Sequence, residues 1–390
     1  MKPIVYLTLT HDWELRGNGS GDIEQIQFAP MRKLLTIYKK YGVRTSFNPD
    51  VMQQLAFRKL GTEYPELKTL ADTWDEYVLE AFRQEHDIQL HIHPQWLNAE
   101  YSGGGWSLTG DWSILNYDPE TALAMMTESK NYLENLLQPL DASYRCIAFR
   151  AGALAIAPSP CLLGILTRLG IVLDVSIAGG LYVDTSQLQL DYRRCEETFL
   201  PFYPRMEDAR KISDRPQEIV CVPIHSFYGS RRQVFRQHLE IVWRKLKQRA
   251  ASEAGESYSP TAIYAKRQWQ QRSHLSPVRL LYDKGVLPYL IGKYIVSDTA
   301  RLNYPLLREM LKSIRQRALA SGEEEVPIVL TNHPKEIVDF AVIERFIGEV
   351  SQAEDIKFIT LTELVRKLQS GKFQIRGGST ERQDATITSL

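Results

Sequence analysis

The sequence shows no excess of charge of either sign. It has 47 Lys and Arg against 47 Asp and Glu among 390 residues, so its formal net charge is zero. A dedicated nucleic-acid-binding protein needs a strong excess of Lys and Arg to neutralise phosphates. The composition therefore argues against nucleic acid as a partner. With 44% hydrophobic and 24% charged residues, it also excludes collagen-like, coiled-coil and disordered chains.

Long hydrophobic runs are absent too. No stretch approaches the roughly 20 apolar residues of a membrane-spanning helix, because the longest candidate, Val286 to Val296, is interrupted by Pro288 and Gly292. The amino-terminal segment reaches polar residues after a few positions, which is typical of a strand rather than of a signal peptide. We therefore expect a cytoplasmic protein without a transmembrane segment.

Cysteine is scarce, and its spacing forms no pairs. The sequence has four cysteines, at Cys146, Cys161, Cys195 and Cys221. This pattern predicts reduced thiols rather than a disulfide framework or a zinc motif. Internal repeats and low-complexity blocks are also lacking. The length then suggests two or three domains, or one large α/β barrel with insertions.

Apolar, β-branched segments alternate with segments of helical periodicity. This alternation predicts an α/β fold with a parallel sheet or barrel. The strand-like segments are Ile4–Thr10, Val43–Phe47, Asp87–His93, Arg145–Phe149, Ile171–Val175, Ile219–Pro223, Pro327–Leu330 and Phe358–Thr360. The helix-like segments are Phe28–Tyr41, Leu67–Arg83, Glu120–Leu137, Cys161–Leu169, Ile337–Glu349 and Leu361–Leu368.

The alternation is interrupted between residues 181 and 325 and then resumes. We therefore expect residues 1–180 and 326–370 to form one barrel. Residues 181–325 are predicted to be a long, mainly helical insertion that contributes one barrel or cleft strand at 219–223. The polar tail, 371–390, is predicted to be disordered.

Polar residues gather where the predicted strands end, which is where parallel α/β folds place their reactive groups. Asp12 and Glu14 are two residues apart, so in an extended segment both carboxylates face the same side. His91 and His93 have the same spacing. Arg150 follows the fourth strand. A further imidazole, His333, follows the late strand at 327–330.

This set of side chains suits metal-assisted hydrolysis. Two imidazoles and one carboxylate bind a Zn²⁺-like ion and leave positions open for water and substrate. A second carboxylate can take the proton of the water, and another His can protonate a leaving group. Each motif alone also has a structural interpretation, such as a turn for Asp12 and Glu14 or an ion pair for Arg150. Four such strand ends together favour the catalytic interpretation.

The series of strand ends resembles the NodB-homology polysaccharide deacetylases, which are similar to carbohydrate esterase family 4 and belong to the glycoside hydrolase/deacetylase barrel superfamily. The resemblance covers roughly residues 3–180 and 326–368, in the order of the family's motifs. The matching segments are Thr10-His11-Asp12-Trp13-Glu14, Glu85-His86-Asp87-Ile88-Gln89-Leu90-His91-Ile92-His93-Pro94, Phe149-Arg150-Ala151-Gly152, Leu173-Asp174-Val175-Ser176 and Leu330-Thr331-Asn332-His333.

The resemblance implies a fold, a reaction and four catalytic residues. The fold would be a distorted (β/α) barrel of about seven parallel strands. The reaction would be hydrolysis of an N-acetyl group on an amino sugar. Asp12 would be the general base and His333 the general acid. Arg150 would orient Asp12, and Asp174 would support the site.

The resemblance also implies a divalent metal ion, with Zn²⁺ favoured. His91 and His93 would be ligands. Trp13 stands where many members carry a metal-binding Asp, so Glu14 would supply the third ligand, with Asp12 as the alternative. Among residues near these motifs, we assign substrate contacts to Trp13, Trp96 and His225, the last because it follows a segment that resembles the family's cleft-lining strand.

The predicted insertion contains a basic stretch. Residues 230–272 hold ten Lys and Arg against three Glu, and apolar residues recur there at helical spacing. Such a pattern, clearest over 231–249, is typical of a helix that touches a membrane surface or an anionic glycan. The alternative is a solvated helix packed on the barrel.

Three functions remain open from the sequence. The first is a metal-dependent N-deacetylase that acts on a carbohydrate, such as a lipid-linked or nucleotide-linked precursor. The second is a metal-independent amidohydrolase, or a glycoside hydrolase that uses Asp12 and Glu14 as its carboxylate pair. The third is a catalytically silent carbohydrate-binding relative. Bound metal and release of acetate distinguish the three.

Overall fold

The computed structural model describes residues 2–102, 105–185, 187–236, 239 and 292–378. Most of the basic stretch 230–272 and the end of the predicted tail, 379–390, lie outside the described residues. Within the described ranges, no helix is both long and apolar enough to span a membrane.

The first sheet is built around the first strand of the chain. β1 (Ile4–Trp13) lies between β16 (Glu325–Asn332) and β2 (Ser46–Pro49), and it also pairs with β17 (Ile356–Phe358). β3 (Asp87–Ile88) continues the sheet beyond β2. All of these pairings are parallel, so the carboxyl ends of the strands meet at one edge.

The second sheet has four parallel strands. Its order is β13 (Val220–Cys221), β8 (Leu173–Asp174), β7 (Ala148–Ala151) and β4 (Leu90–Ile92). The strands are short and buried, with Val, Leu, Ile, Phe and Ala at most positions. Continuous burial is expected for strands of a parallel sheet that is covered on both faces.

One predicted strand, Asp87–His93, is shared between the two sheets. It is interrupted at Gln89, whose side-chain carbonyl accepts the backbone N–H groups of Ile147 and Ala148, both at 2.9 Å. The part before Gln89 is β3 and the part after it is β4. At the point where the strand passes from one sheet to the other, the Gln89 side chain therefore accepts hydrogen bonds that a neighbouring backbone would otherwise accept.

The two sheets are joined by single bridges. One bridge pairs Asp50 with His91, and the other pairs Ile224 with Val329. The predicted α/β class and the parallel sheets are confirmed. Among the described residues, the strands form two parallel sheets and not a barrel closed by a continuous ladder of hydrogen bonds. The predicted closed barrel is therefore not confirmed.

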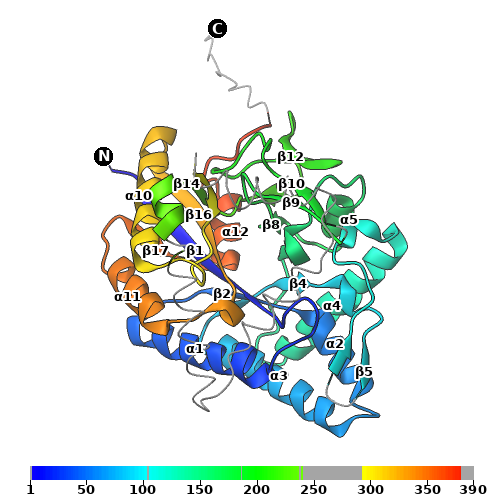
Figure 1. The fold of residues 1–390 in the computed structure, drawn as a ribbon. Helices are drawn as coiled ribbons and strands as arrows, with labels where there is room; N and C mark the ends of the chain where they lie inside the picture. The colour runs from blue at the N-terminus through cyan, green and yellow to red at the C-terminus, as the bar shows by residue number, and fades with distance from the viewer. Residues whose placement is uncertain (1, 103–104, 186, 237–238, 240–291, 379–390) are drawn as a thin grey trace.

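Helices surround the strands (Figure 1). Asp118 accepts the N–H groups of Glu120 and Thr121 and caps the helix that starts at Pro119, as the sequence Asp118-Pro119 predicts. The helices are α1 (Ala29–Tyr41), α2 (Val51–Leu60), α3 (Pro65–Arg83), α4 (Pro119–Leu137), α5 (Leu162–Arg168), α10 (Tyr304–Ser321), α11 (Phe340–Ser351) and α12 (Leu361–Gln369).

Shorter elements complete the described chain. They carry the loops at the ends of the main strands. The helical turns are η1 (Glu24–Phe28), η2 (Pro94–Trp96), η3 (Ile114–Asn116), η4 (Gly152–Leu154) and η6 (Pro334–Glu336); the antiparallel pairs are β5 (Glu100–Ser102) with β6 (Gly105–Ser107), β9 (Tyr182–Asp184) with β10 (Gln189–Asp191), β11 (Pro204–Arg205) with β12 (Asp208–Ile212), and β14 (Ser226–Gly229) with β15 (Lys293–Val296).

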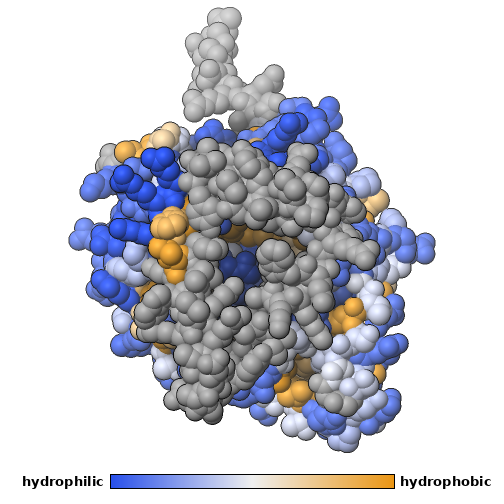
Figure 2. Space-filling view, in the orientation of Figure 1, coloured by the Kyte–Doolittle hydropathy of each residue, from blue (hydrophilic) through white to orange (hydrophobic). Residues whose placement is uncertain are grey.

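The two faces of β1 have different surroundings. Val5, Leu7 and Leu9 belong to the large core that includes the surrounding helices. Tyr6 belongs to a second core, which also contains residues of β7, β8, β13, β16 and α12. We call this second cluster the inner core. Because side chains alternate along a strand, Asp12 lies on the same face as Tyr6, six residues further along. Figure 2 shows hydrophilic residues deep in the middle of the face that it presents.

Candidate active site

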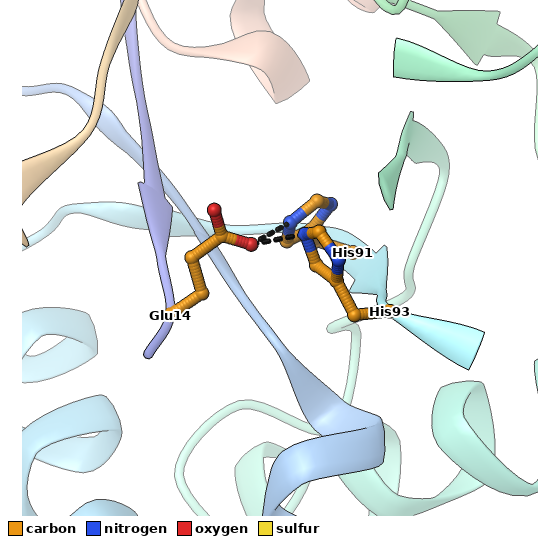
Figure 3. A group of neighbouring side chains, drawn as sticks. All are labelled: Glu14, His91 and His93. Atoms are coloured by element: carbon orange, nitrogen blue, oxygen red, sulfur yellow. Dashed lines mark hydrogen bonds and ion pairs between the residues drawn. The ribbon is translucent and has the colours of Figure 1, made fainter. Parts of the chain in front are cut away.

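Three buried side chains form a cluster that can bind a metal ion. Glu14 follows β1, and His91 and His93 come from β4 and its end. Their donor atoms lie within 4.8 Å of one another. The Oε2 atom of Glu14 is 3.0 Å from Nε2 of His91 and also pairs with Nε2 of His93. Figure 3 shows both rings approaching the same carboxylate. The ligand spacing predicted from the sequence thus brings the three residues together.

Groups behind the imidazoles fix how they face the cluster. Nδ1 of His91 donates to the carbonyl oxygen of Arg150 at 2.8 Å, which directs Nε2 to Glu14. Nδ1 of His93 is 3.1 Å from the side-chain amide nitrogen of Gln95, and the backbone N–H of His93 donates to Oδ1 of Asp50 at 3.0 Å. Burial alone would lower the pKa of His91, but neighbouring carboxylates raise it to about 9. The carboxylates of Glu14, Asp12 and Asp50 thus make the surroundings of His91 negative.

The backbone on both sides of Glu14 is held by two buried glutamines. Gln53 accepts the N–H of Leu15 at 3.0 Å and donates to Oε1 of Gln27 at 2.8 Å. Gln27 donates to the carbonyl oxygen of Trp13 at 3.3 Å. Both glutamines are fully buried. The network fixes the peptide groups that set the direction of the Glu14 side chain.

A lysine that the sequence analysis did not assign contacts the same carboxylate. Nζ of Lys335 donates to Oε1 of Glu14 at 2.6 Å and to the carbonyl oxygen of Leu15 at 2.9 Å. Burial alone would raise the pKa of Glu14, but His93, Lys335 and His91 hold it well below its usual value. The carboxylate is therefore ionised. Lys335 lies two residues after His333, so its place near a strand end was the only signal in the sequence.

Asp12 is held by Arg150, as the resemblance implied. Nη1 of Arg150 donates to both carboxylate oxygens, at 3.0 and 2.9 Å, and Asn48 adds a bond of 3.2 Å to Oδ1. Arg150 is fully buried and also donates to the carbonyl oxygen of Val175 and to Oγ1 of Thr10. Burial alone would raise the pKa of Asp12, but Arg150 and two imidazoles lower it below its usual value.

His333 lies between two carboxylates. Its Nδ1 is 2.8 Å from Oδ2 of Asp298, and its Nε2 is 3.5 Å from Oδ2 of Asp12. Asp298 follows β15 and pairs with Thr331 of β16 in a single parallel bridge. The sequence analysis missed Asp298 because it falls in the predicted insertion. The feature that could have identified Asp298 is the one used for Asp12: a carboxylate close to the end of a strand.

Asp174 is buried, and its hydrogen bonds go to Ser176 and Cys221 and not to Asp12 or the Glu14–His91–His93 cluster. It accepts the N–H of Ser176 at 3.1 Å and the hydroxyl of Ser176 at 2.6 Å. The same hydroxyl accepts the N–H of Ala151 at the end of β7. Burial raises the pKa of Asp174 to about 6. Its contacts place it as a support for β7, which carries Arg150.

The two tryptophans expected to contact substrate lie in the core. Trp13 is fully buried, packs against Trp74 at 5.4 Å between ring centroids, and donates to the carbonyl oxygen of Gln27. It occupies the face of β1 opposite to Asp12. Trp96 is 3% exposed and packs edge-on against Trp106. This burial argues against the predicted substrate contacts of both residues.

His225 also lies away from the cluster. Its Nδ1 is 2.7 Å from Oγ of Ser297, and Nε2 is 3.5 Å from Oγ of Ser313 on α10. Burial lowers its pKa to about 3. Ile224 belongs to the inner core, so the alternation of side chains turns His225 outward toward α10. This position argues against the predicted contact with substrate.

The residues present fit a divalent metal ion. Two imidazoles and one carboxylate are the ligand set of one class of catalytic zinc centre. Both imidazoles have a partner at Nδ1, the carbonyl oxygen of Arg150 for His91 and the side-chain amide of Gln95 for His93. Asp12, the alternative ligand, lies outside the three-residue cluster and is engaged by Arg150. The chain thus has a buried His–His–Glu cluster that can hold an ion, next to an Asp–His pair.

No family model matches the sequence, and no curated protein matches it. Solved structures do match. A proposed polysaccharide deacetylase from Mycobacterium smegmatis is 14% identical, with 97% of this chain and 95% of that chain covered and a TM-score of 0.49. A 4-alpha-glucanotransferase from Thermococcus litoralis is 13% identical, with 94% and 41% covered and a TM-score of 0.47. PuuE allantoinase is 10% identical, with 95% and 91% covered and a TM-score of 0.44.

The matches therefore include polysaccharide deacetylases, which the sequence motifs resemble, at distant sequence identity. The three proteins described above differ in their activities.

Proposed function

We propose that the protein is a metal-dependent hydrolase that removes an N-acetyl group from an amino sugar. One observation carries this proposal. The Glu14–His91–His93 cluster lies next to an Asp12–His333 pair whose nearest atoms are 3.5 Å apart. A metal site beside one carboxylate and one imidazole contains the groups that metal-assisted hydrolysis of an amide needs.

Asp12 is the proposed general base. Its lowered pKa keeps the carboxylate ionised at neutral pH. Two hydrogen bonds from Arg150 fix the plane of the carboxylate. An ionised, oriented carboxylate accepts the proton of the attacking water without a change in its own position.

His333 is the proposed general acid. Its Nδ1–H donates to Asp298, which leaves Nε2 directed toward Asp12 and the reacting groups. An imidazole oriented in this way by a carboxylate can give a proton to the leaving amine. Asp298 is a positioning residue in this scheme.

Glu14, His91 and His93 would hold the ion. When bound, a divalent ion polarises the substrate carbonyl and a water molecule, and Zn²⁺ suits this ligand set best. The carbonyl oxygen of Arg150 and the side-chain amide of Gln95 contact Nδ1 of His91 and of His93, which directs each Nε2 to Glu14.

The substrate class follows from the motif resemblance described above. We infer an N-acetylated amino sugar in a glycan or in a lipid-linked or nucleotide-linked precursor. Contact with a membrane surface through 231–249 belongs to the same proposal, and most of that stretch lies outside the described residues.

A glycoside hydrolase is less well supported. Such an enzyme needs two carboxyl groups free to act on opposite sides of a glycosidic bond. Glu14 is already engaged by two imidazoles and Lys335, and Asp12 by Arg150. A metal-independent amidohydrolase and a silent carbohydrate-binding protein are outcomes of the test below.

The test combines metal analysis with acetate release from a panel of N-acetylated sugars. We expect about one bound divalent ion per chain. His91→Ala should lose both the ion and the activity. Asp12→Asn should keep the ion and lower kcat by about 10²- to 10⁴-fold. Asp214→Asn is the matched control, because the Asp214 side chain is 89% exposed.

Full activity in both site variants would contradict the proposal. Acetate release that persists after complete removal of metal would indicate the metal-independent amidohydrolase. Metal binding without acetate release from any sugar of the panel would favour the silent carbohydrate-binding protein.

A further inference from the structure

A buried lysine contacts the carboxylate of the metal-ligand cluster. The side chain of Lys335 is 7% exposed, and Nζ lies 2.6 Å from Oε1 of Glu14. A second bond of 2.9 Å to the carbonyl oxygen of Leu15 fixes the ammonium group. Lys335 is in η6, which directly follows His333 at the end of β16. Both ends of the interaction are therefore anchored to neighbouring strands, β1 and β16.

The two oxygens of Glu14 have different partners. Oε2 faces the imidazoles of His91 and His93, whereas Oε1 faces the ammonium group of Lys335. With Oε1 engaged, only Oε2 is available to an ion. The positive charge of Lys335 also opposes the approach of a second positive charge to the same carboxylate, and such effects are strong at distances of a few ångströms inside a protein.

We propose that Lys335 is a positioning residue that limits Glu14 to one ligand oxygen and weakens the affinity of the site for its divalent ion. The inference rests on the proposed metal site. It concerns a residue that neither the motif resemblance nor the ligand cluster includes.

A purely structural ion pair is the competing explanation. Glu14 does not need Lys335 for hydrogen bonding alone, because two imidazoles already contact its other oxygen. The second acidic group of the site, Asp12, has its own cation in Arg150. Lys335 thus acts on the metal-binding carboxylate and not on the base. The structural explanation predicts that removing the ammonium group loosens Glu14 and weakens metal binding, whereas our proposal predicts the reverse.

The experiment measures metal affinity and not activity. The full-length protein is stripped of metal and titrated with Zn²⁺ against a chromophoric chelator. We expect Lys335→Met to bind Zn²⁺ at least 10-fold more tightly than the wild type. Lys335→Arg keeps the charge and should stay within about threefold of the wild type. Lys40→Met is the control, because Lys40 forms an ion pair with Glu344 on the surface.

A second readout follows the coordination of Co²⁺. Freeing Oε1 lets Glu14 bind with both oxygens, so we expect weaker visible absorption of Co²⁺ in Lys335→Met, in the direction of a higher coordination number. Lys335→Gln, which keeps a donor for Leu15, should behave like Lys335→Met. It provides the measurement if Lys335→Met does not fold.

The outcomes separate this inference from the proposed function. Unchanged or weaker Zn²⁺ binding in both neutral variants would overturn the role of Lys335 and leave the proposed hydrolase intact. Failure of the wild-type protein to bind any divalent ion would overturn both.

Discussion

Both proton-transfer groups of the candidate site have a charged residue behind them. Arg150 holds Asp12 with two bonds, and Asp298 holds His333 with one. Burial alone would raise the pKa of Asp298, but His333 and Arg301 lower it below its usual value. Asp298 is therefore ionised and can stabilise a protonated imidazole. In the candidate site, the carboxylate of Asp12 thus has the cation Arg150 as its partner, and the imidazole of His333 has the anion Asp298.

This pairing gives the first prediction at the scale of the residue. We expect Asp298→Asn to lower kcat by about 10- to 100-fold, the range typical for partners that orient a reacting group. KM should change little, because Asp298 lies behind His333 and not in front of it. Steady-state kinetics on an N-acetylated sugar would measure both constants. An equal loss of kcat in the exposed Asp214→Asn control, or an unchanged kcat in Asp298→Asn, would contradict the assigned role.

Asp174 provides a prediction for stability. Burial raises its pKa from 3.8 to about 6, so between these values the folded protein holds a proton that the unfolded chain has lost. The contribution of Asp174 to the free energy of unfolding must then fall as pH rises from 4 to 6. Two pKa units correspond to about 3 kcal/mol. Asn does not titrate in this range, so we expect Asp174→Asn to lack this pH-dependent decrease. The free energy of unfolding of the variant should therefore rise relative to that of the wild type between pH 4 and pH 6.

The measurement compares urea midpoints of the two proteins at pH 4, 5, 6 and 7. Any change in the two bonds from Ser176 shifts the variant by a constant amount, whereas the effect of ionisation changes with pH. A difference between variant and wild type that does not change over this range would show that Asp174 does not titrate there.

At this scale the sequence placed together several side chains that the structure also brings together. Asp12, Glu14, His91 and His93 could be grouped because spacing by two puts side chains on one face of a strand. Lys335 could not be assigned, because its side chain reaches back past His333 to another strand, and no periodicity describes such a path. The expected roles of Trp13 and His225 overlooked the alternation of side chains. Alternation turns Trp13 to the face of β1 opposite Asp12, and it turns His225 away from the inner core, to which its neighbour Ile224 belongs.

At the scale of the element, the ends of β4 and β7 approach each other closely. A methyl group on Gly152 would lie 2.5 Å from the carbonyl oxygen of Ile92 and 3.2 Å from the ring of His93. The first of these is backbone and cannot move aside. Glycine at this position therefore permits the end of β7 to pack against the imidazole of His93, a candidate metal ligand.

We accordingly expect Gly152→Ala to displace His93. The overpacking should cost about 1–3 kcal/mol of stability, and Zn²⁺ affinity should fall by at least 10-fold. Gly164→Ala on α5 is the matched control: a methyl group there meets nothing within 4 Å, and alanine should stabilise the helix by up to about 1 kcal/mol. Chelator competition and urea unfolding measure the two effects. Normal Zn²⁺ affinity in Gly152→Ala would contradict the packing argument.

Elements with clear periodicity were predicted well, and interruptions were not. The helix predicted at Leu67–Arg83 is α3 (Pro65–Arg83), and the strand predicted at Ile4–Thr10 is β1. The break at Gln89 could not be foreseen, because it depends on hydrogen bonds to Ile147 and Ala148, which are distant in sequence. The local hydrophobic pattern predicts which face of a strand is buried, but it does not predict which strand will pair with it.

At the scale of the whole molecule, the predicted boundary at 181–325 separated segments that pack together. Ile224 pairs with Val329, and Asp298 pairs with Thr331, so parts of that range extend the sheet edge beside β16. α10, also inside that range, leads directly into β16. The alternation of strand-like and helix-like segments is less regular between residues 181 and 325, but this range still contributes Asp298 to the candidate site.

The inner core and the candidate site occupy different parts of the same strands. Tyr6 belongs to the inner core, and Asp12 is six residues further along β1, about 20 Å at the rise of a strand. α12 contributes Leu364, which is fully buried in the inner core. Stability and metal binding should therefore respond to different substitutions.

Leu364→Ala tests this separation. The cavity should lower the free energy of unfolding by about 2–5 kcal/mol, while Zn²⁺ affinity of the folded protein stays within about threefold of wild type, because the residues around Glu14 keep their contacts. Leu319→Ala is the control, since Leu319 is 66% exposed and such surface changes usually cost within about 0.5 kcal/mol. Urea unfolding and chelator competition at a temperature well below unfolding give the two quantities. If Zn²⁺ affinity fell together with stability, the inner core would be setting the geometry of the metal cluster directly, and the two ends of the strands would act as one unit.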